Sequence, residues 1–207
     1  MILFKSEIRA AVLSGRISIH DDHGNQFPGW EFPNDTTGFV KMNPEGLQPA
    51  SVDLHLGSHW LTPEPNSNVS LWPDPPIPAL DTAKPIKYRA EFSDTFILPA
   101  NGFVLVRTQE VIGLDESIFG KVDGRSSFGR AGLFAETAGV IDNGFYGSIT
   151  LEIVNALPYP VKLYAGTRCC QITFYTGIGS AEGGYQGSYQ GQMGTKGSML
   201  YKTVPQA

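Results

Sequence analysis

Short apolar segments separated by turn residues crowd the chain from Phe96 onward, and this spacing is the feature that most constrains the fold. They lie at residues 103–106, 147–154, 161–163 and 170–175, with Gly, Pro and Asn between them. The chain also holds 24 glycines and 15 prolines in 207 residues, which favours many short strands over a helical bundle. We therefore predict an all-β fold, a β-barrel or distorted jelly roll, rather than a βαβ architecture.

One short helix is predicted at the N-terminus. Ser6 can cap its start, and Gly15 offers a left-handed conformation at its end. Its apolar stripe, at helical spacing, consists of Ile8, Val12 and Leu13.

Two loop regions are predicted on either side of one strand in the first half of the chain. Residues 20–46 are polar and rich in Asn, Asp, Gly and Pro, while residues 63–78 carry six prolines, too many for a central strand. Between these regions Val52, Leu54 and Leu56 alternate with polar residues, as in a half-buried strand.

Composition and charge bound the class of protein. A hydrophobic content of 41% permits a buried core, and 207 residues fit a single domain spanning 1–207. The net charge of −5 gives no general attraction to a nucleic acid polymer or an anionic membrane. No apolar run reaches the length of a membrane span, and no secretory leader is recognisable, so we expect a soluble, cytoplasmic protein.

The C-terminal segment, about residues 177–207, is rich in Gly, Ser, Gln and Tyr. It contains a short repeat, the tripeptide Tyr-Gln-Gly at 185–187 and again at 189–191. Because it has no apolar periodicity it cannot build a core of its own. It is therefore either disordered or ordered by what it covers.

The densest polar cluster lies at residues 123–130, with the sequence Asp-Gly-Arg-Ser-Ser-Phe-Gly-Arg. Guanidinium groups bind phosphate oxygens in a bidentate manner, hydroxyl groups donate hydrogen bonds to them, and glycine lets the backbone amides approach. This composition is typical of a phosphate-binding loop. A surface turn with solvated arginines explains the same composition equally well, since the glycine pattern is not that of a known nucleotide loop.

A second candidate is the carboxylate of Glu152. Within the strand predicted at 147–154, Ile149, Leu151 and Ile153 share one face, so Glu152 lies on the other. Such a carboxylate is either solvated or held in a cleft with a raised pKa. Asp142, in a glycine-rich turn, is either a turn former or a site residue.

Metal ligation and nucleophilic catalysis have little support in this sequence. The histidines at 20, 23, 55 and 59 suit a polar loop or an exposed strand better than a metal site. The His-x-Glu and Pro-Cys-x-x-Cys pattern of zinc deaminases is missing, as is a Gly-x-Ser-x-Gly elbow. The neighbouring Cys169 and Cys170 form no disulfide framework and are predicted to pack as small hydrophobes on a buried strand.

Taken together, these segments resemble the dCTP deaminase branch of the dUTPase-like superfamily. The motifs that carry the resemblance occur in order along nearly the whole chain, at 8–19, 48–57, 124–130, 137–155 and 189–192. The resemblance implies a jelly-roll-like homotrimer with active sites between subunits. It also implies zinc-independent hydrolytic deamination of dCTP to dUTP and ammonia, with Mg²⁺ carried on the triphosphate and no metal ligand in the protein.

The resemblance also implies roles for individual residues. Glu152 matches the catalytic glutamate that takes a proton from the attacking water and passes it to the leaving amine, which requires a pKa nearer neutrality than that of a free Glu. Ser126 and Arg130 resemble the residues that position this water and the base. The implied substrate-binding residues are Arg125 and Ser127 at the phosphates, Ala138 through its carbonyl, Asp142 at the 3′-hydroxyl, Phe145 under the deoxyribose, and Tyr185, Tyr189 and Gln192 in a closing tail.

Three alternatives stay open. A bifunctional dCTP deaminase–dUTPase would keep Glu152 and use Asp142 to activate a second water, giving dUMP and diphosphate. A plain dUTPase normally lacks this glutamate, and a nucleotide-binding regulator would have lost turnover. Ser188 and Met199 stand where basic residues are usual, and the interval from Arg130 to Asp142 is one residue short. The sequence leaves inhibition by dTTP and a preference for modified cytosine undecided.

Overall fold

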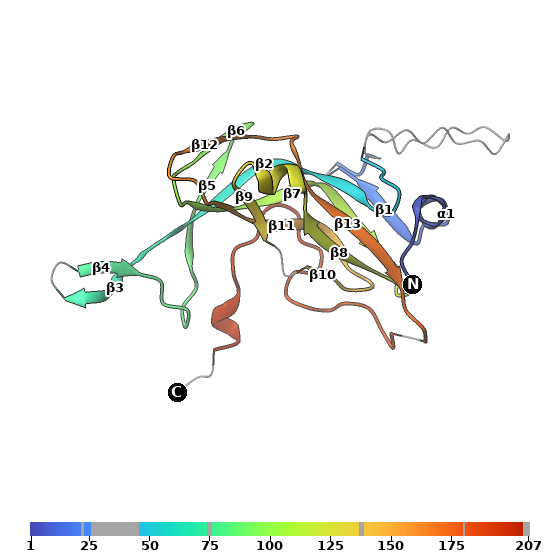
Figure 1. The fold of residues 1–207 in the computed structure, drawn as a ribbon. Helices are drawn as coiled ribbons and strands as arrows, with labels where there is room; N and C mark the ends of the chain where they lie inside the picture. Colours follow the sequence, from blue (N-terminus) through green and yellow to red (C-terminus); the bar gives the residue numbers. More distant parts are fainter. Residues whose placement is uncertain (22, 26–45, 74–75, 137–138, 180, 205–207) are drawn as a thin grey trace.

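Strands dominate the chain in the computed structural model, in agreement with the prediction (Figure 1). The structure describes residues 1–21, 23–25, 46–73, 76–136, 139–179 and 181–204. In chain order the elements are α1 (Lys5–Leu13), β1 (Ile17–His20), β2 (Val52–Glu64), β3 (Asn66–Pro73), β4 (Pro76–Ala79), β5 (Lys87–Phe92), β6 (Thr95–Leu98), β7 (Phe103–Leu114), β8 (Ile118–Gly124), α2 (Ser126–Arg130), β9 (Leu133–Glu136), β10 (Val140–Ile141), β11 (Tyr146–Asn155), β12 (Val161–Tyr164), β13 (Arg168–Thr176) and the 3₁₀ turn η1 (Leu200–Lys202).

A curled nine-stranded sheet forms the body of the molecule. Its strands follow the order β10-β8-β13-β2-β7-β11-β9, with β1 added to β7 and β5 added to β2. The long strand β2 joins the two halves, because its first residues pair with β13 and its later residues pair with β7 and β5. All these pairings are antiparallel, as expected for the predicted all-β fold.

The strand β11 carries the alternation that the sequence predicts. Ile149, Leu151 and Ile153 are buried in the core, while Thr150 and Glu152 are only partly buried on the opposite face. The strand is positioned by β7 along most of its length and by β9 over its last residues. Side chains that face away from the core on β11 therefore have fixed positions.

The N-terminal helix is present, but two details of its prediction are wrong. Ser6 is not its cap: the N-cap is Phe4, without a side-chain hydrogen bond, and the Ser6 hydroxyl donates to Glu7 instead. Leu13 is 54% exposed, and the buried residues of the helix are Ile8 and Ala11. Tertiary backbone bonds fix this start, since the amide of Lys5 donates to the carbonyl of Pro49 at 2.8 Å.

The proline-rich stretch at 63–78 is not simply a loop. It contains the end of β2 and the strands β3 and β4, which form a two-stranded ribbon projecting from the main sheet (Figure 1). The prolines are tolerated there because a short peripheral ribbon needs few ladder hydrogen bonds. The other predicted loop, 20–46, lies largely outside the described residues.

The two cysteines pack as predicted. Cys169 and Cys170 are both free thiols with no exposed surface on β13. Burial raises the pKa of the Cys169 thiol well above its ordinary value, so the thiol stays protonated. None of the described helices has the length and apolar character needed to cross a membrane.

Substitution of Leu151 tests whether the buried face of β11 supports the fold. Leu151→Ala removes a fully buried side chain and is expected to lower the free energy of unfolding by about 2–5 kcal/mol. Urea unfolding measures the change. Ile178→Ala, at a fully exposed position, is the matched control and should leave stability within about 0.5 kcal/mol. Equal effects of the two substitutions would contradict the packing described for β11.

Candidate active site

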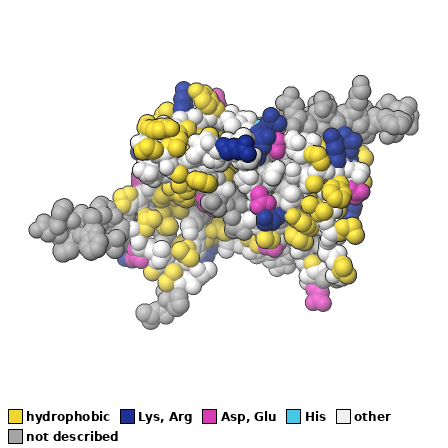
Figure 2. Space-filling view, in the orientation of Figure 1, with side chains coloured by type: hydrophobic (Ala, Val, Ile, Leu, Met, Phe, Trp, Pro, Cys, Tyr) yellow, Lys and Arg dark blue, Asp and Glu magenta, His cyan; other side chains and the backbone are white. Residues whose placement is uncertain are grey.

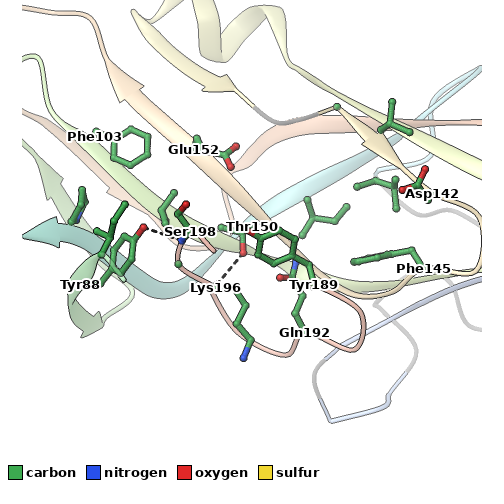
Figure 3. A pocket seen from close by; sticks show the side chains of 18 of the residues that line it. Tyr88, Phe103, Asp142, Phe145, Thr150, Glu152, Tyr189, Gln192, Lys196 and Ser198 are labelled. Atoms are coloured by element: carbon green, nitrogen blue, oxygen red, sulfur yellow. Dashed lines mark hydrogen bonds between the residues drawn. The ribbon is translucent and has the colours of Figure 1, made fainter. Parts of the chain in front are cut away.

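A pocket of about 870 Å³ lies beside β11, bordered by β7 and by the C-terminal tail (Figure 3). Asp142 and Phe145 stand at one end of the pocket, Phe103 and Tyr88 at the other, and Glu152 lies between them. Of the site residues predicted from sequence, the pocket brings together Asp142, Phe145, Glu152, Tyr185, Tyr189 and Gln192.

Glu152 faces this pocket because of the alternation of β11. It pairs with Leu105 on β7, and its partly buried side chain keeps the Oε2 atom away from solvent. Thr150, two residues earlier, lies on the same face and lines the same pocket. The carboxylate thus lines the pocket together with the apolar Leu105 and the polar Thr150.

Asp142 and Phe145 are placed by the tight turn that precedes β11. The amide of Phe145 donates to the carbonyl of Asp142 at 3.2 Å, and Gly144 adopts a positive φ of 76° within the turn. Asp142 is exposed, whereas Phe145 is buried and its ring lies 5.9 Å from that of Tyr185, tilted by 56°. One aromatic residue of the tail therefore packs on the turn.

The described part of the tail packs on β11 and on the turn before it. Gln192 is buried and forms a parallel bridge with Gly147 at the edge of β11. The amide of Ser148 donates to the Gln192 carbonyl at 2.9 Å, and the Gln192 amide side chain donates to the Ser148 carbonyl at 2.5 Å. A Cβ atom at Gly147 would lie 2.8 Å from the Gln192 carbonyl oxygen, so this close approach requires glycine.

Thr195 anchors the tail further along. It is buried, its hydroxyl donates to the His59 carbonyl, and it accepts the amide proton of Arg107 at 2.9 Å. Its own amide donates to Nδ1 of His59 at 3.2 Å, which requires that nitrogen to be unprotonated. Burial, with a further contribution from the Arg107 charge, lowers the pKa of His59 and favours this neutral form.

The Gly124–Arg130 cluster lies elsewhere on this chain. Arg125 and Ser126 line a separate groove of about 430 Å³, and Ser127 and Arg130 are exposed. The Nε atom of Arg125 is 3.3 Å from the carboxylate of Asp53, which is almost fully buried. The residues predicted to bind phosphate, Arg125 and Ser127, therefore do not line the same pocket as Glu152, the predicted general base, within one chain. Ala138 lies outside the described residues.

The histidines take structural positions. His55 Nδ1 lies 2.6 Å from the buried carboxylate of Glu110, and His59 stacks on Phe92 with ring centroids 4.2 Å apart. Over the part of the chain that the structure describes, no group of three or more His, Cys, Asp or Glu side chains could hold a metal ion. Asp22, part of the weak candidate at 20–23, is not among the described residues.

Sequence reasoning missed several residues of the pocket. Thr150 and Lys196 line it, Tyr88 accepts a hydrogen bond from the amide of Ser198 at 2.9 Å, and Thr195 anchors the tail. Thr150 could have been found from its place beside Glu152 on the same strand face. Thr195, Lys196 and Ser198 carried no such signal, because hydrogen bonds to residues far away in the sequence place them and no side-chain periodicity marks them.

Comparison with known proteins gives the family of this chain. The family model described as "dCTP deaminase-like" matches residues 35–177. The chain belongs to the dCTP deaminase-like family. This confirms the resemblance inferred from the motifs, and with it the expectation of an enzyme of this family.

Curated relatives agree with this assignment. A protein of Persephonella marina is 41% identical over 160 residues, covering 75% of this chain and 83% of that protein. A protein of Streptomyces griseus is 32% identical over 208 residues, covering 98% and 96%. Both are named "dCTP deaminase, dUMP-forming".

A solved structure shares the fold. It is that of the 2′-deoxycytidine 5′-triphosphate deaminase from Agrobacterium tumefaciens, with a TM-score of 0.54 and 22% identity. The alignment covers 85% of this chain and 46% of the solved chain, so this dCTP deaminase-like chain spans less than half the length of that protein.

The hydrogen bond to His59 predicts a pH-dependent tail. Because the folded chain binds the His59 proton less readily than the unfolded chain, the free energy of unfolding should fall as pH drops below the ordinary pKa of 6.5. Protonation of Nδ1 also removes the acceptor for Thr195. We expect faster proteolysis of the tail at pH 5.5 than at pH 7.5, measured by mass spectrometry.

The matched control for this prediction is the exposed His23. His59→Ala should abolish the difference in proteolysis between the two pH values, and His23→Ala should preserve it. A pH difference that persists unchanged in His59→Ala would show that another group controls the tail.

Proposed function

We propose that this chain hydrolyses dCTP in two successive steps, to dUMP, ammonia and diphosphate. Water adds at C4 of cytosine and ammonia leaves, giving dUTP; a second water then attacks the α-phosphate and diphosphate leaves. The observation that carries the proposal is that two carboxylates, Glu152 and Asp142, line one pocket. The relatives named "dUMP-forming" support it over deamination that stops at dUTP.

Glu152 is the proton carrier of the first step. As a carboxylate it takes a proton from the attacking water, and the same oxygen then delivers a proton to the departing amine. Its place on β11 suits this role, because the paired strands fix the backbone at Glu152 and the Oε2 atom is shielded from bulk solvent.

Asp142 is the carboxylate for the second water and for the deoxyribose 3′-hydroxyl. It is exposed at the opposite end of the pocket from Phe103 and Tyr88, where a nucleotide with its base at Glu152 would place its sugar (Figure 3). Phe145, packed against Tyr185, gives an apolar surface under the sugar. Mg²⁺ enters as part of the substrate, bound to the triphosphate.

The groove of Arg125 and Ser126 supplies the remaining contacts from a neighbouring copy of the chain in a trimer. Neither Ser126 nor Arg130 lines the pocket of Glu152 within one chain, which supports contact of these two residues with the base across a subunit boundary. The exposed apolar side chains of Phe92 on β5, Ile97 on β6 and Tyr164 on β12 offer surface for such an assembly. Figure 2 shows hydrophobic side chains gathered over this part of the molecule.

Separate substitution of the two carboxylates tests the proposed function. Glu152→Gln should reduce ammonia release from Mg²⁺–dCTP by about a hundred- to ten-thousand-fold, because the amide cannot accept the water proton. This variant should still convert added dUTP to dUMP. Asp142→Asn should have the opposite effect and accumulate dUTP. Chromatography of the nucleotides, with an ammonia assay, measures both reactions.

Glu91→Gln, at an exposed carboxylate on β5 outside the pocket, is the control and should behave as the wild-type chain. Wild-type chain that stops at dUTP would favour the monofunctional deaminase, and binding without turnover would favour a regulator. Deamination at a near wild-type rate in Glu152→Gln would refute the catalytic role of this residue.

Assembly tests the shared site. Sedimentation equilibrium in dilute buffer is expected to give three times the chain mass of 22.5 kDa. Mixing inactive Glu152→Gln chains with inactive Arg130→Ala chains should restore some activity, because a trimer of mixed composition contains sites with both residues intact. A monomer that turns over dCTP would contradict the model.

A further inference from the structure

The pocket carries more acidic than basic side chains, although the proposed ligand is a negatively charged nucleotide. Its lining includes the carboxylates of Asp142 and Glu152, and Lys196 is the single basic side chain among the described residues that line it. A polyanionic triphosphate that enters such a pocket is repelled by both carboxylates. The basic side chains of the Gly124–Arg130 cluster lie outside this lining, so Lys196 is the cation that this chain itself provides there.

The backbone at Lys196 is held in place. Its amide donates to the Thr150 hydroxyl at 3.1 Å, and the preceding residue, Thr195, is the buried anchor of the tail. Thr150 lies on the same strand face as Glu152. The hydrogen bond to Thr150 therefore fixes the position of the Lys196 backbone relative to the Glu152 carboxylate. Figure 3 shows the ammonium group of Lys196 at the rim, pointing away from Glu152.

The ammonium group has no competing carboxylate in the described part of the chain. Other lysines do: Lys121 pairs with Asp123 at 2.7 Å, and Lys84 pairs with Asp81 at 3.1 Å. No such pair among the described residues involves Lys196, whose side chain is exposed. A cation that forms no ion pair with any described residue and lies beside an acidic pocket is suited to bind an anionic ligand.

We infer that Lys196 is a substrate-binding residue that contacts the triphosphate of the nucleotide when the tail covers the pocket. This inference rests on the proposed function, because it takes the ligand to be a nucleoside triphosphate. Lys196 lies outside the segment 35–177 that the family model matches. It supplies, from a different position, a positive charge that the tail lacks at Ser188 and Met199.

Steady-state kinetics with Mg²⁺–dCTP test this inference. Lys196→Gln is expected to raise KM about tenfold while leaving kcat unchanged, the loss typical of one hydrogen bond to a charged group. The rise of KM with added NaCl should be shallower than in the wild-type chain, because one screened attraction is gone. Lys196→Arg keeps the charge and should keep a KM close to that of the wild-type chain.

Lys202→Gln is the matched control, since Lys202 is an exposed lysine of the same tail that does not line the pocket. Equal KM values for Lys196→Gln and Lys202→Gln would overturn the inference. So would a shifted pH profile of kcat with unchanged KM, which would mean that Lys196 acts on Glu152 instead. A wild-type chain that does not turn over dCTP would instead contradict the proposed function.

Discussion

Backbone pairing along β11 holds the candidate site together, and most other features depend on it. One edge of β11 pairs with β7, and the other pairs with β9 near its end and with the tail near its start. Because three partners fix one strand, Glu152, Thr150 and the turn at Asp142 keep constant relative positions. A strand held at one edge alone could slip in register, and a slip of one residue would turn Glu152 into the core.

The same pairing explains which predictions from sequence succeed. The alternation of Ile149, Leu151 and Ile153 placed Glu152 on the strand face opposite the core, because successive side chains of a strand point to opposite faces. The burial of Cys169 and Cys170 followed from a different argument, because small apolar side chains on a strand covered on both faces are buried whichever way they point. Local patterns predict local structure well when the element is long and one of its faces is buried.

Other features could not be predicted from local patterns. Ser6 has the chemistry of a cap, but the helix starts at Lys5 because the amide of Lys5 reaches the carbonyl of Pro49, far away in sequence. The ribbon of β3 and β4 forms despite its prolines, since a peripheral hairpin has few ladder bonds to lose. Thr195 and the pocket residue Lys196 were missed because groups far away in the sequence position them, the carbonyl of His59 and the hydroxyl of Thr150.

The docking of the tail has a consequence for how its sequence can change. The contacts that fix Gln192 and Thr195 are made largely with carbonyl and amide groups of β2, β7 and β11, which every sequence possesses. Between these two anchors, the side chain of Met193 is exposed and is free to change. Gly147 is the exception, because the sheet must keep room there for a second backbone. The tail can thus gain or lose charges over evolution while its path over the pocket is preserved.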